Sequence, residues 1–335
     1  MNNIMKKEIK KEIMKLKLVA GTTSFLIVFF MFITLGGGFS FAEEKEIVEQ
    51  IQDEDFMVLN LNESYNERSD VFSGLEDKIQ AKSVLIWDMT EGINLFSVNE
   101  DLSLPLASIT KVMTALVALE NSSPETEILI KADFMNQYGS GGFFVNDRWE
   151  LLDILDGALT SSNNDAAFAA GSIVGALNFT NSGNHVSGNI SFVSEMNRRS
   201  LQLGMNQTHF LNTTGLDENE FLSGADGSAY DVLKLFKYVI KNHPELLDST
   251  RESSIRRSSL NGNVRVFDNT NRNIHNIPRL IGSKTGFTDL AGGNLTVAYE
   301  PVIGKPVIVV VLGSTFNGRF DDMNILIDSI DKYFN

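Results

Sequence analysis

The sequence predicts an α+β fold in which strands from both ends of the folded region form one antiparallel sheet, with an inserted all-helical lobe. Three observations predict it. Apolar runs typical of strands occur before residue 100 and again after residue 260. The residues between them carry apolar side chains at helical spacing. The chain has 335 residues with 43% hydrophobic content, which is enough to bury one large core or two smaller ones.

The N-terminal end differs in character from the rest. Residues 1–17 hold six lysines and precede an uncharged, mostly apolar run over residues 18–35. Eighteen helical residues, at about 1.5 Å each, approach the thickness of a bilayer core. We therefore expect a basic cytoplasmic segment at 1–17 and a transmembrane anchor at 18–36, oriented with the lysines in the cytoplasm. A signal sequence cleaved near Ala42 and a buried helix of a soluble domain are the alternatives.

Composition separates a spacer from a folded domain and limits the partners. Residues 37–78 are rich in Glu, Asp and Asn with little apolar periodicity, which indicates an acidic spacer before a domain at 79–335. The net charge of −15 makes nucleic acid an improbable partner. The chain has no cysteine, which excludes thiolate chemistry and disulfides and fits an extracytoplasmic location.

The elements of the domain follow in order. Residues 83–88 and 94–98 are expected to form two strands joined by a turn at 90–92. A helix is expected from Ser108 to Leu119, because apolar residues recur there at helical spacing after Pro105. Further helices are expected at 149–159, 166–177, 190–203 and 229–241, with a surface loop at 178–189. The last elements expected are strands at 264–267, 280–284, 293–299 and 307–312 and an amphipathic helix at 319–334.

Ser108 and Lys111 form a candidate nucleophile and base. A serine hydroxyl needs a base that accepts its proton, and positions three apart on a helix face the same way. Lysine is a base only if its pKa falls, and burial together with a second cation such as Lys284 would lower that pKa. A helix start at Ser108 would also offer N–H groups to an oxyanion. The Ser-x-x-Lys spacing also arises by chance in a chain of this length.

Two further strings carry polar side chains. Ser162-Asn163-Asn164 precedes an expected helix, and Ser and Asn are favoured residues at a helix N-cap. In the functional interpretation, Ser162 could relay a proton from Lys111 while Asn164 holds a substrate carbonyl. Lys284-Thr285-Gly286 ends an expected strand, where a lysine can protect a sheet edge or, with the threonine and glycine, hold a carboxylate. The N–H of Phe287 could complete the oxyanion hole.

Together the three strings indicate a family. Ser-x-x-Lys, Ser-Asp-Asn and Lys-Thr-Gly in this order are the signature of class A β-lactamases and penicillin-binding proteins. In this chain the second string is Ser-Asn-Asn. Over about residues 80–335 the sequence resembles the low-molecular-mass penicillin-binding proteins of the D-alanyl-D-alanine carboxypeptidase family, serine peptidase family S11. The resemblance rests on the segments at 106–115, 159–167 and 282–292, supported by those at 196–197, 203–205, 210–216 and 228–231.

The resemblance implies a β-lactamase/transpeptidase-like catalytic domain at 79–335 and a role for each matching residue. Ser108 resembles the acylated nucleophile and Lys111 its base, while Ser162 and Asn164 resemble the relay pair. The substrate-binding residues implied are Lys284, Thr285, Gly286, Phe287 and Arg272, of which Lys284, Thr285 and Arg272 would face the terminal carboxylate of the substrate. The sequence departs from the family at Asn163, where a glycine is usual.

The resemblance also implies the reaction and its partners. The expected reaction is removal of the terminal D-alanine from peptidoglycan stem peptides ending in D-Ala-D-Ala, a step of cell-wall and cell-shape maintenance. No metal or organic cofactor is implied, and β-lactams are the expected inhibitors. The catalytic domain is expected on the extracytoplasmic side of the cell membrane.

Several alternatives stay open at this point. A DD-endopeptidase would share every catalytic residue, and a non-catalytic cell-wall-binding protein could keep the cleft. A class A β-lactamase is disfavoured because no Glu-x-x-x-Asn pattern lies between the second and third strings. A metal-dependent peptidase is disfavoured because the four histidines show no paired ligand spacing. The sequence also lacks Gly-x-Ser-x-Gly, the pattern of the α/β-hydrolases.

Overall fold

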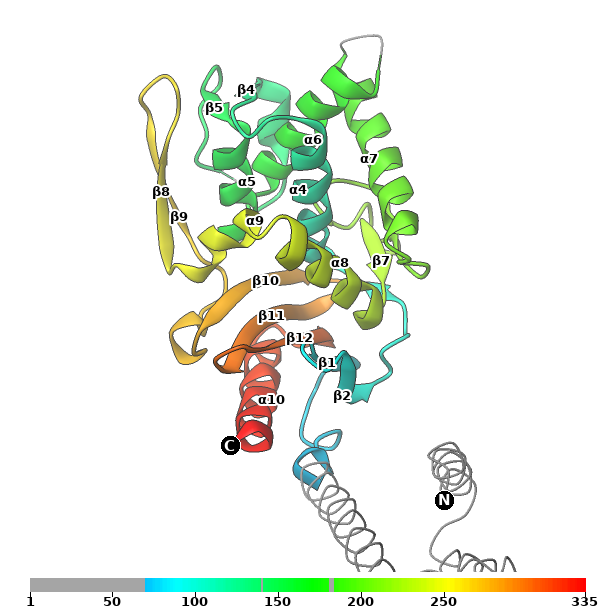
Figure 1. Ribbon diagram of the computed structural model, residues 1–335. Helices are drawn as coiled ribbons and strands as arrows, with labels where there is room; N and C mark the ends of the chain where they lie inside the picture. The colour runs from blue at the N-terminus through cyan, green and yellow to red at the C-terminus, as the bar shows by residue number, and fades with distance from the viewer. Residues whose placement is uncertain (1–69, 140, 181–183) are drawn as a thin grey trace, which may run out of the picture. The chain divides into compact units, whose positions relative to one another are not determined.

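The computed structural model describes residues 70–139, 141–180 and 184–335 (Figure 1). The basic segment expected at 1–17, the anchor or signal expected at 18–36 and most of the spacer expected at 37–78 lie outside these residues. Within the described ranges, no helix combines the length and apolar character needed to cross a bilayer.

One antiparallel sheet, built from both ends of the described chain, organises the fold. Its strands are β1 (Ser83–Asp88), β2 (Ile93–Val98), β10 (Leu280–Thr288), β11 (Gly292–Val302) and β12 (Lys305–Ser314). They lie in the order β10-β11-β12-β1-β2, with Leu85 of β1 opposite Val310 of β12. The predicted antiparallel sheet formed by both ends of the folded region is therefore confirmed, and β10 lies at an edge.

Both faces of the sheet are covered, which explains the continuous apolar run of β12. Alternate residues of a strand point to opposite faces. Val309 packs in a cluster with helix α10 (Gly318–Phe334), whereas Val310 packs in the cluster of the helical lobe. Figure 1 shows α10 and the helical lobe on opposite sides of the sheet. A strand buried on both faces reads as unbroken hydrophobic sequence rather than as an alternating pattern.

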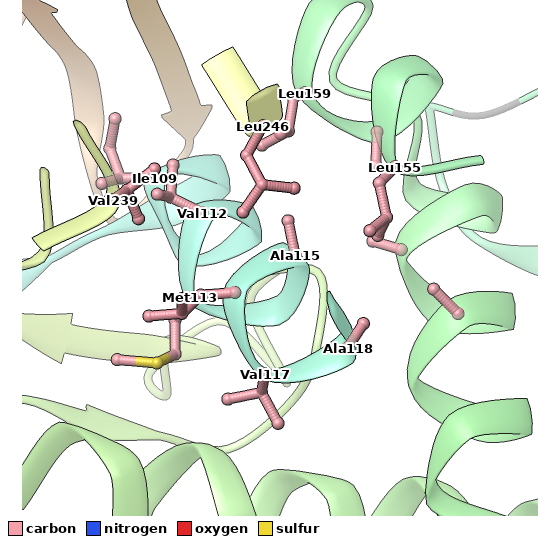
Figure 2. Packing of buried hydrophobic residues seen from close by; sticks show 14 of the residues in the cluster. Ile109, Val112, Met113, Ala115, Val117, Ala118, Leu155, Leu159, Val239 and Leu246 are labelled. Carbon is pink, nitrogen blue, oxygen red and sulfur yellow. The ribbon is translucent and has the colours of Figure 1, made fainter. Parts of the chain in front are cut away.

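Helix α4 (Thr110–Asn121) is the buried centre of the helical lobe. It is surrounded by α5 (Leu151–Thr160), α6 (Asn164–Asn178), α7 (His185–Gln202) and α8 (Ala229–Asn242). Figure 2 shows side chains of α4, among them Met113 and Ala115, packed with residues from α5, α8 and α9 (Glu245–Asp248). Every residue from Thr110 to Ala118 is buried. The helix is therefore buried on all sides, and its first turn lies out of contact with bulk water.

The remaining elements are short. The strands are β3 (Leu104–Pro105), β4 (Glu127–Leu129), β5 (Arg148–Glu150), β6 (His209–Phe210), β7 (Ala225–Gly227), β8 (Ser254–Ser258) and β9 (Val264–Asp268). The 3-10 turns are η1 (Asp70–Phe72), η2 (Ala107–Ile109), η3 (Ala132–Asn136), η4 (Ser249–Arg251) and η5 (Ile274–Asn276).

Several predicted boundaries were wrong. Trp149 belongs to β5, where it pairs with Ile128, so the helix expected from 149 begins at Leu151. The loop expected at 178–189 is shorter, because α7 begins at His185 after an Asn184 side chain that caps it by accepting a hydrogen bond from the N–H of Val186. The periodicity that starts at residue 190 misses this polar first turn.

Two strand predictions also need correction. The strand expected at 264–267 forms as β9, but it pairs with β8 in a separate hairpin and not with the main sheet. β8 itself was not predicted, because its sequence is mostly exposed Ser and Arg. The strand expected to end at Lys284 continues to Thr288, so the Lys-Thr-Gly string lies inside β10 rather than at its end.

The folded unit begins before residue 79. Phe72 and Leu75, which lie in the segment expected to be spacer, are both buried. The Phe72 ring stacks on Phe96 of β2 at 6.1 Å between centroids and contacts Tyr333 of α10 at 5.5 Å. The last part of the expected spacer therefore packs against the sheet and its covering helix.

Candidate active site

Ser108 and Lys111 lie next to each other at the start of the buried helix α4. Ser108 lies in η2, directly before α4, and Lys111 lies in the first turn of α4. Lys111 Nζ is 2.7 Å from Ser108 Oγ. Ala107, immediately before the serine, has φ of +47°, a conformation that is strained for a residue other than glycine. The predicted pairing of hydroxyl and amine is therefore present, and it follows a strained turn.

The surroundings of Lys111 favour the neutral amine. The side chain is completely buried. Burial, and to a smaller extent the charge of Lys284, hold the pKa of Lys111 well below its usual range. Lys111 Nζ also donates a hydrogen bond of 2.7 Å to the carbonyl oxygen of Thr214. With one N–H donated to Thr214, the neutral amine still has its lone pair available for the Ser108 hydroxyl.

The Thr214 carbonyl is held by a side chain whose role the sequence analysis missed. Asn212 Oδ1 accepts hydrogen bonds from the N–H of Thr214, from Thr214 Oγ1 and from the N–H of Gly215, at 3.1, 3.0 and 2.7 Å. Gly215 has φ of +76°, and a Cβ at this position would overlap the carbonyl oxygen of Ala107. The turn residues Asn and Gly three positions apart were the available sequence signal.

The second string joins three parts of the chain. Ser162 lies between α5 and α6 with φ of +60°, and its Oγ accepts a hydrogen bond of 3.0 Å from Lys284 Nζ. Asn163, not Ser162, is the N-cap of α6, because its Oδ1 accepts from the N–H of Ala166 at 2.9 Å. Asn163 Nδ2 also donates to the carbonyl of Gly141 at 2.9 Å. The side chain that replaces the usual glycine therefore ties the segment before β5 to the start of α6.

Asn164 extends the same connection. Its Nδ2 donates to the carbonyl of Tyr138 at 2.6 Å. Tyr138 and Gly141 are thus each bonded to a side chain that follows Ser162. The expected link between the Asn164 amide and Lys111 stays a prediction.

Lys284 connects the second string to the third. It lies on the edge strand β10 and is almost completely buried. Besides Ser162, its Nζ donates to the carbonyl of Thr285 at 2.9 Å. Burial, and to a smaller extent the charge of Arg319, lower the pKa of Lys284 to about 7. The structure therefore places two lysine amines in one buried region, where the charge of Lys284 lowers the pKa of Lys111.

Gly286 brings β10 against the nucleophile. A Cβ at Gly286 would lie 3.0 Å from the carbonyl oxygen of Leu106 and 3.2 Å from the backbone nitrogen of Ser108. Only glycine allows this approach without displacing η2. The N–H of Ser108 and the peptide group that joins Gly286 to Phe287 are therefore neighbours, as an oxyanion hole between the two residues requires.

The expected carboxylate clamp is only partly assembled. Thr285 is buried, and its Oγ1 lies 2.6 Å from the Oγ1 of Thr270, so the threonine hydroxyl already has a partner. Arg272 is exposed, with its guanidinium over the Phe316 ring at 5.5 Å. Phe316 also contacts Phe287 edge to face at 4.9 Å. Arg272 thus lies on Phe316, which in turn contacts Phe287, the residue directly after the Lys-Thr-Gly string.

Arg319 is a second residue that sequence analysis missed. It lies in the first turn of α10 and donates from Nη1 to the carbonyl of Gly286 at 2.7 Å. Burial and the nearby charge of Arg272 lower the pKa of Arg319 to about 10, so it remains a cation at neutral pH. A helix dipole disfavours a cation in the first turn, and this position was the available sequence signal.

The chemistry available is acyl transfer by an activated serine. Ser108 has a base at bonding distance, two backbone N–H groups nearby for a developing oxyanion, and a cluster of cations beside them. Within residues 70–139, 141–180 and 184–335, no group of three or more His, Asp or Glu side chains is placed to hold a metal ion.

Comparisons with known proteins agree with this site. The Peptidase_S11 family model, described as D-alanyl-D-alanine carboxypeptidase, matches residues 70–315. A D-alanyl-D-alanine endopeptidase of Pseudomonas aeruginosa is 32% identical over 244 residues, which cover 71% of this chain and 73% of that protein. A D-alanyl-D-alanine carboxypeptidase of Escherichia coli is 27% identical over 285 residues, which cover 81% of this chain and 68% of that protein.

Solved structures share the fold. Penicillin-binding protein D2 from Listeria monocytogenes, in its cefotaxime-bound form, aligns with a TM-score of 0.63 at 27% identity over 77% of this chain and 98% of that chain. A variant of the Streptomyces K15 DD-transpeptidase aligns with a TM-score of 0.67 at 23% identity over 76% of this chain and 98% of that chain. The predicted transpeptidase-like fold is confirmed.

The double role of Asn163 can be tested by its effect on stability. We expect Asn163→Ala to lower the free energy of unfolding by about 1 kcal/mol, because α6 loses its cap. Asn163→Gly should cost only a few tenths of a kcal/mol for the cap. Asn163→Asp keeps an acceptor for the Ala166 N–H but cannot donate to the Gly141 carbonyl. Its change in the free energy of unfolding therefore reports the loss of the hydrogen bond to Gly141. Chemical denaturation measures all three, and wild-type stability in Asn163→Ala would refute the capping role.

Proposed function

Since the chain belongs to the S11 family of serine peptidases, we propose that it removes the terminal D-alanine from peptidoglycan stem peptides through an acyl-enzyme on Ser108. The observation that carries this proposal is the 2.7 Å contact between the Ser108 hydroxyl and a buried Lys111 amine. A protein that only bound the cell wall would gain nothing from a low-pKa base aimed at a serine, so the contact favours an enzyme.

Each step of the reaction has a group to perform it. Lys111 accepts the Ser108 proton while Oγ bonds to the carbonyl carbon of the penultimate D-alanine, and the N–H groups of Ser108 and Phe287 stabilise the oxyanion. The C–N bond then breaks, and the departing amine of D-alanine takes the proton by way of Lys111 and Ser162. Water attacks the ester, releases the shortened peptide and restores the hydroxyl. In this scheme Lys284, Thr285 and Arg272 attract the terminal carboxylate of the substrate.

β-Lactams are proposed to acylate the same serine. Opening of their strained amide forms the same ester, but the departing nitrogen stays attached to the acyl group and impedes the attack of water. The solved structures of Listeria penicillin-binding protein D2 are described as cefotaxime-bound and ampicillin-bound forms, which supports carrying this property to the present chain.

A DD-endopeptidase that cleaves cross-links is the second candidate. The endopeptidases of Pseudomonas aeruginosa and Escherichia coli are 32% and 31% identical to this chain, against 27% for the Escherichia coli carboxypeptidase. Cross-link cleavage would use the same serine, base and oxyanion hole, and the two activities differ in the size of the leaving group. For either substrate we propose an extracytoplasmic catalytic unit tethered by residues 18–36.

Labelling by a fluorescent penicillin tests the nucleophile. We expect the full chain to form a covalent adduct, and Ser108→Ala to abolish it because no other hydroxyl lies at bonding distance from Lys111 Nζ among the described contacts. Gel fluorescence after denaturation measures the adduct. Labelling of Ser108→Ala at the wild-type level would refute the assignment, and Ser103→Ala provides a matched serine control outside the site.

Mass spectrometry of muropeptides separates the two candidate reactions. We expect the full chain to shorten stem peptides by one alanine residue and to release free D-alanine. Ser108→Ala should release none, which controls for contaminating peptidases. Conversion of cross-linked dimers to monomers without release of D-alanine would instead identify a DD-endopeptidase.

The charge of Lys284 should contribute to the pH dependence of acylation. Acylation needs the neutral Lys111 amine, so its rate rises as pH increases through the pKa of Lys111. Removing the Lys284 charge raises that pKa, so Lys284→Met should shift the rising limb of the profile to higher pH. Second-order rates of penicillin labelling measured across pH test this. Lys284→Arg, which retains a positive charge, should shift the limb less, and an unshifted limb in Lys284→Met would contradict the coupling.

A further inference from the structure

Arg319 occupies a costly position in the fold. Its side chain is 4% exposed, and the rings of Phe316, Phe320 and Phe287 lie 4.7, 4.8 and 6.0 Å from its guanidinium carbon. A buried guanidinium loses its hydration, and the dipole of α10 repels a cation in the first turn. Aromatic faces offset part of this cost. The polar contact that Arg319 makes in return is the 2.7 Å bond to the carbonyl of Gly286.

Gly293 leaves space for the Arg319 side chain. A Cβ at Gly293 of β11 would lie 3.2 Å from Cδ of Arg319 and would overlap the carbonyl oxygen of Thr315. Gly293 is paired with Phe287 in the sheet. The absence of a side chain at residue 293 therefore lets α10 approach the sheet and lets the arginine reach the neighbouring strand.

Holding this carbonyl also fixes the N–H on the other side of the same peptide group. The peptide that joins Gly286 to Phe287 is trans, because no cis peptide bond occurs among the described residues. In a trans peptide the C=O and N–H point in opposite directions. β10 is an edge strand, and Gly286 lies against the backbone nitrogen of Ser108. With its carbonyl anchored by Arg319, the peptide directs the Phe287 N–H away from the arginine.

The cation also changes the strength of that N–H as a donor. A charged donor on an amide oxygen draws electron density through the conjugated C–N bond, so the N–H of the same group becomes more polar. Donors that are fixed and polarised before the reaction stabilise a developing oxyanion without reorganisation.

We propose that Arg319 is a positioning residue of the oxyanion hole, which fixes and polarises the Gly286–Phe287 peptide from behind so that the Phe287 N–H faces the reacting carbonyl. The inference rests on the proposed acyl-transfer function and extends it to a residue of the C-terminal helix. Arg319 does not touch the substrate in this role.

Selective NMR labelling observes this peptide group directly. With ¹³C-carbonyl glycine and ¹⁵N-phenylalanine, a carbonyl-to-amide correlation spectrum of the full chain contains only Gly-Phe pairs, which occur at Gly38-Phe39, Gly142-Phe143 and Gly286-Phe287. Phe287→Leu assigns the third signal. We expect Arg319→Met to shift the Gly286 carbonyl carbon and the Phe287 amide proton upfield, because both lose polarisation. Arg319→Lys should keep much of the wild-type shift, and Lys332→Gln, on the exposed side of the same helix, should leave the signal unchanged.

Acylation kinetics connect the peptide to the reaction. We expect the maximal rate of penicillin acylation to fall about 10- to 100-fold in Arg319→Met, less than the roughly 100- to 1,000-fold lost when a whole oxyanion donor is removed. The half-saturating concentration should stay near the wild-type value, and Arg319→Lys should retain more of the rate. The carbonyl stretch of the acyl-enzyme should move to higher frequency in Arg319→Met, since weaker hydrogen bonds to the oxygen stiffen that bond.

The results that would overturn the inference are distinct from those that would overturn the function. An unshifted Gly286–Phe287 signal in Arg319→Met refutes the anchoring. A shifted signal with a wild-type acylation rate and carbonyl stretch refutes the catalytic consequence, as does a defect confined to the half-saturating concentration. If Arg319→Met does not fold, an Arg319→Lys protein with wild-type amide shifts and a large acylation defect overturns the inference as well. If the unaltered protein forms no adduct, the proposed function fails first.

Discussion

The structure depends on burying two lysine amines, Lys111 and Lys284, of which the second lowers the pKa of the first. Lys111 and Lys284 are both almost completely buried, and within the described part of the chain neither has a carboxylate among its hydrogen-bond partners. Burial disfavours the charged form of both amines and lowers both pKa values, and a neighbouring cation adds to this effect, Lys284 at Lys111 and Arg319 at Lys284. The fold therefore carries a destabilising element at its centre, and the surrounding parts are arranged to tolerate it.

Rigid packing around the two amines meets that requirement. Helix α4 is buried along its first nine residues, so Lys111 is held by a helix that hydrophobic contacts fix on all sides. Lys284 lies on β10, where Gly286 permits close contact with η2. The Asn212 side chain fixes the turn that carries the Thr214 carbonyl, a hydrogen-bond partner of Lys111. The non-glycine residues with positive φ next to the reacting groups, Ala107 and Ser162, show that local backbone strain is accepted at the same place.

Much of this architecture could be predicted from sequence, because the signals were local. The i to i+3 spacing of Ser108 and Lys111 and the apolar run of β12 led directly to the correct pairing and the correct sheet. Contacts made by backbone atoms gave no such signal: the Thr214 carbonyl and the Gly286 carbonyl are chemically identical to those of any other residue. Arg319 was missed because its partner lies on a different element, and β8 was missed because the exposed hairpin lacks an apolar pattern. An N-cap within Ser162-Asn163-Asn164 was expected and falls on Asn163, whereas the bond from its Nδ2 to the Gly141 carbonyl had no sequence signal.

The pairing of β1 with β12 has a consequence for how the protein is made. A chain synthesised from its N-terminus produces the serine-bearing turn early, whereas the partner strand and the helix with Arg319 emerge last. Such long sequence separation slows folding, because a large loop must close before the sheet gains its central contacts. An incomplete chain thus contains the nucleophile without β10, the strand that lies against Ser108. The two halves of the site are therefore brought together only after the C-terminal strands and helix have been made.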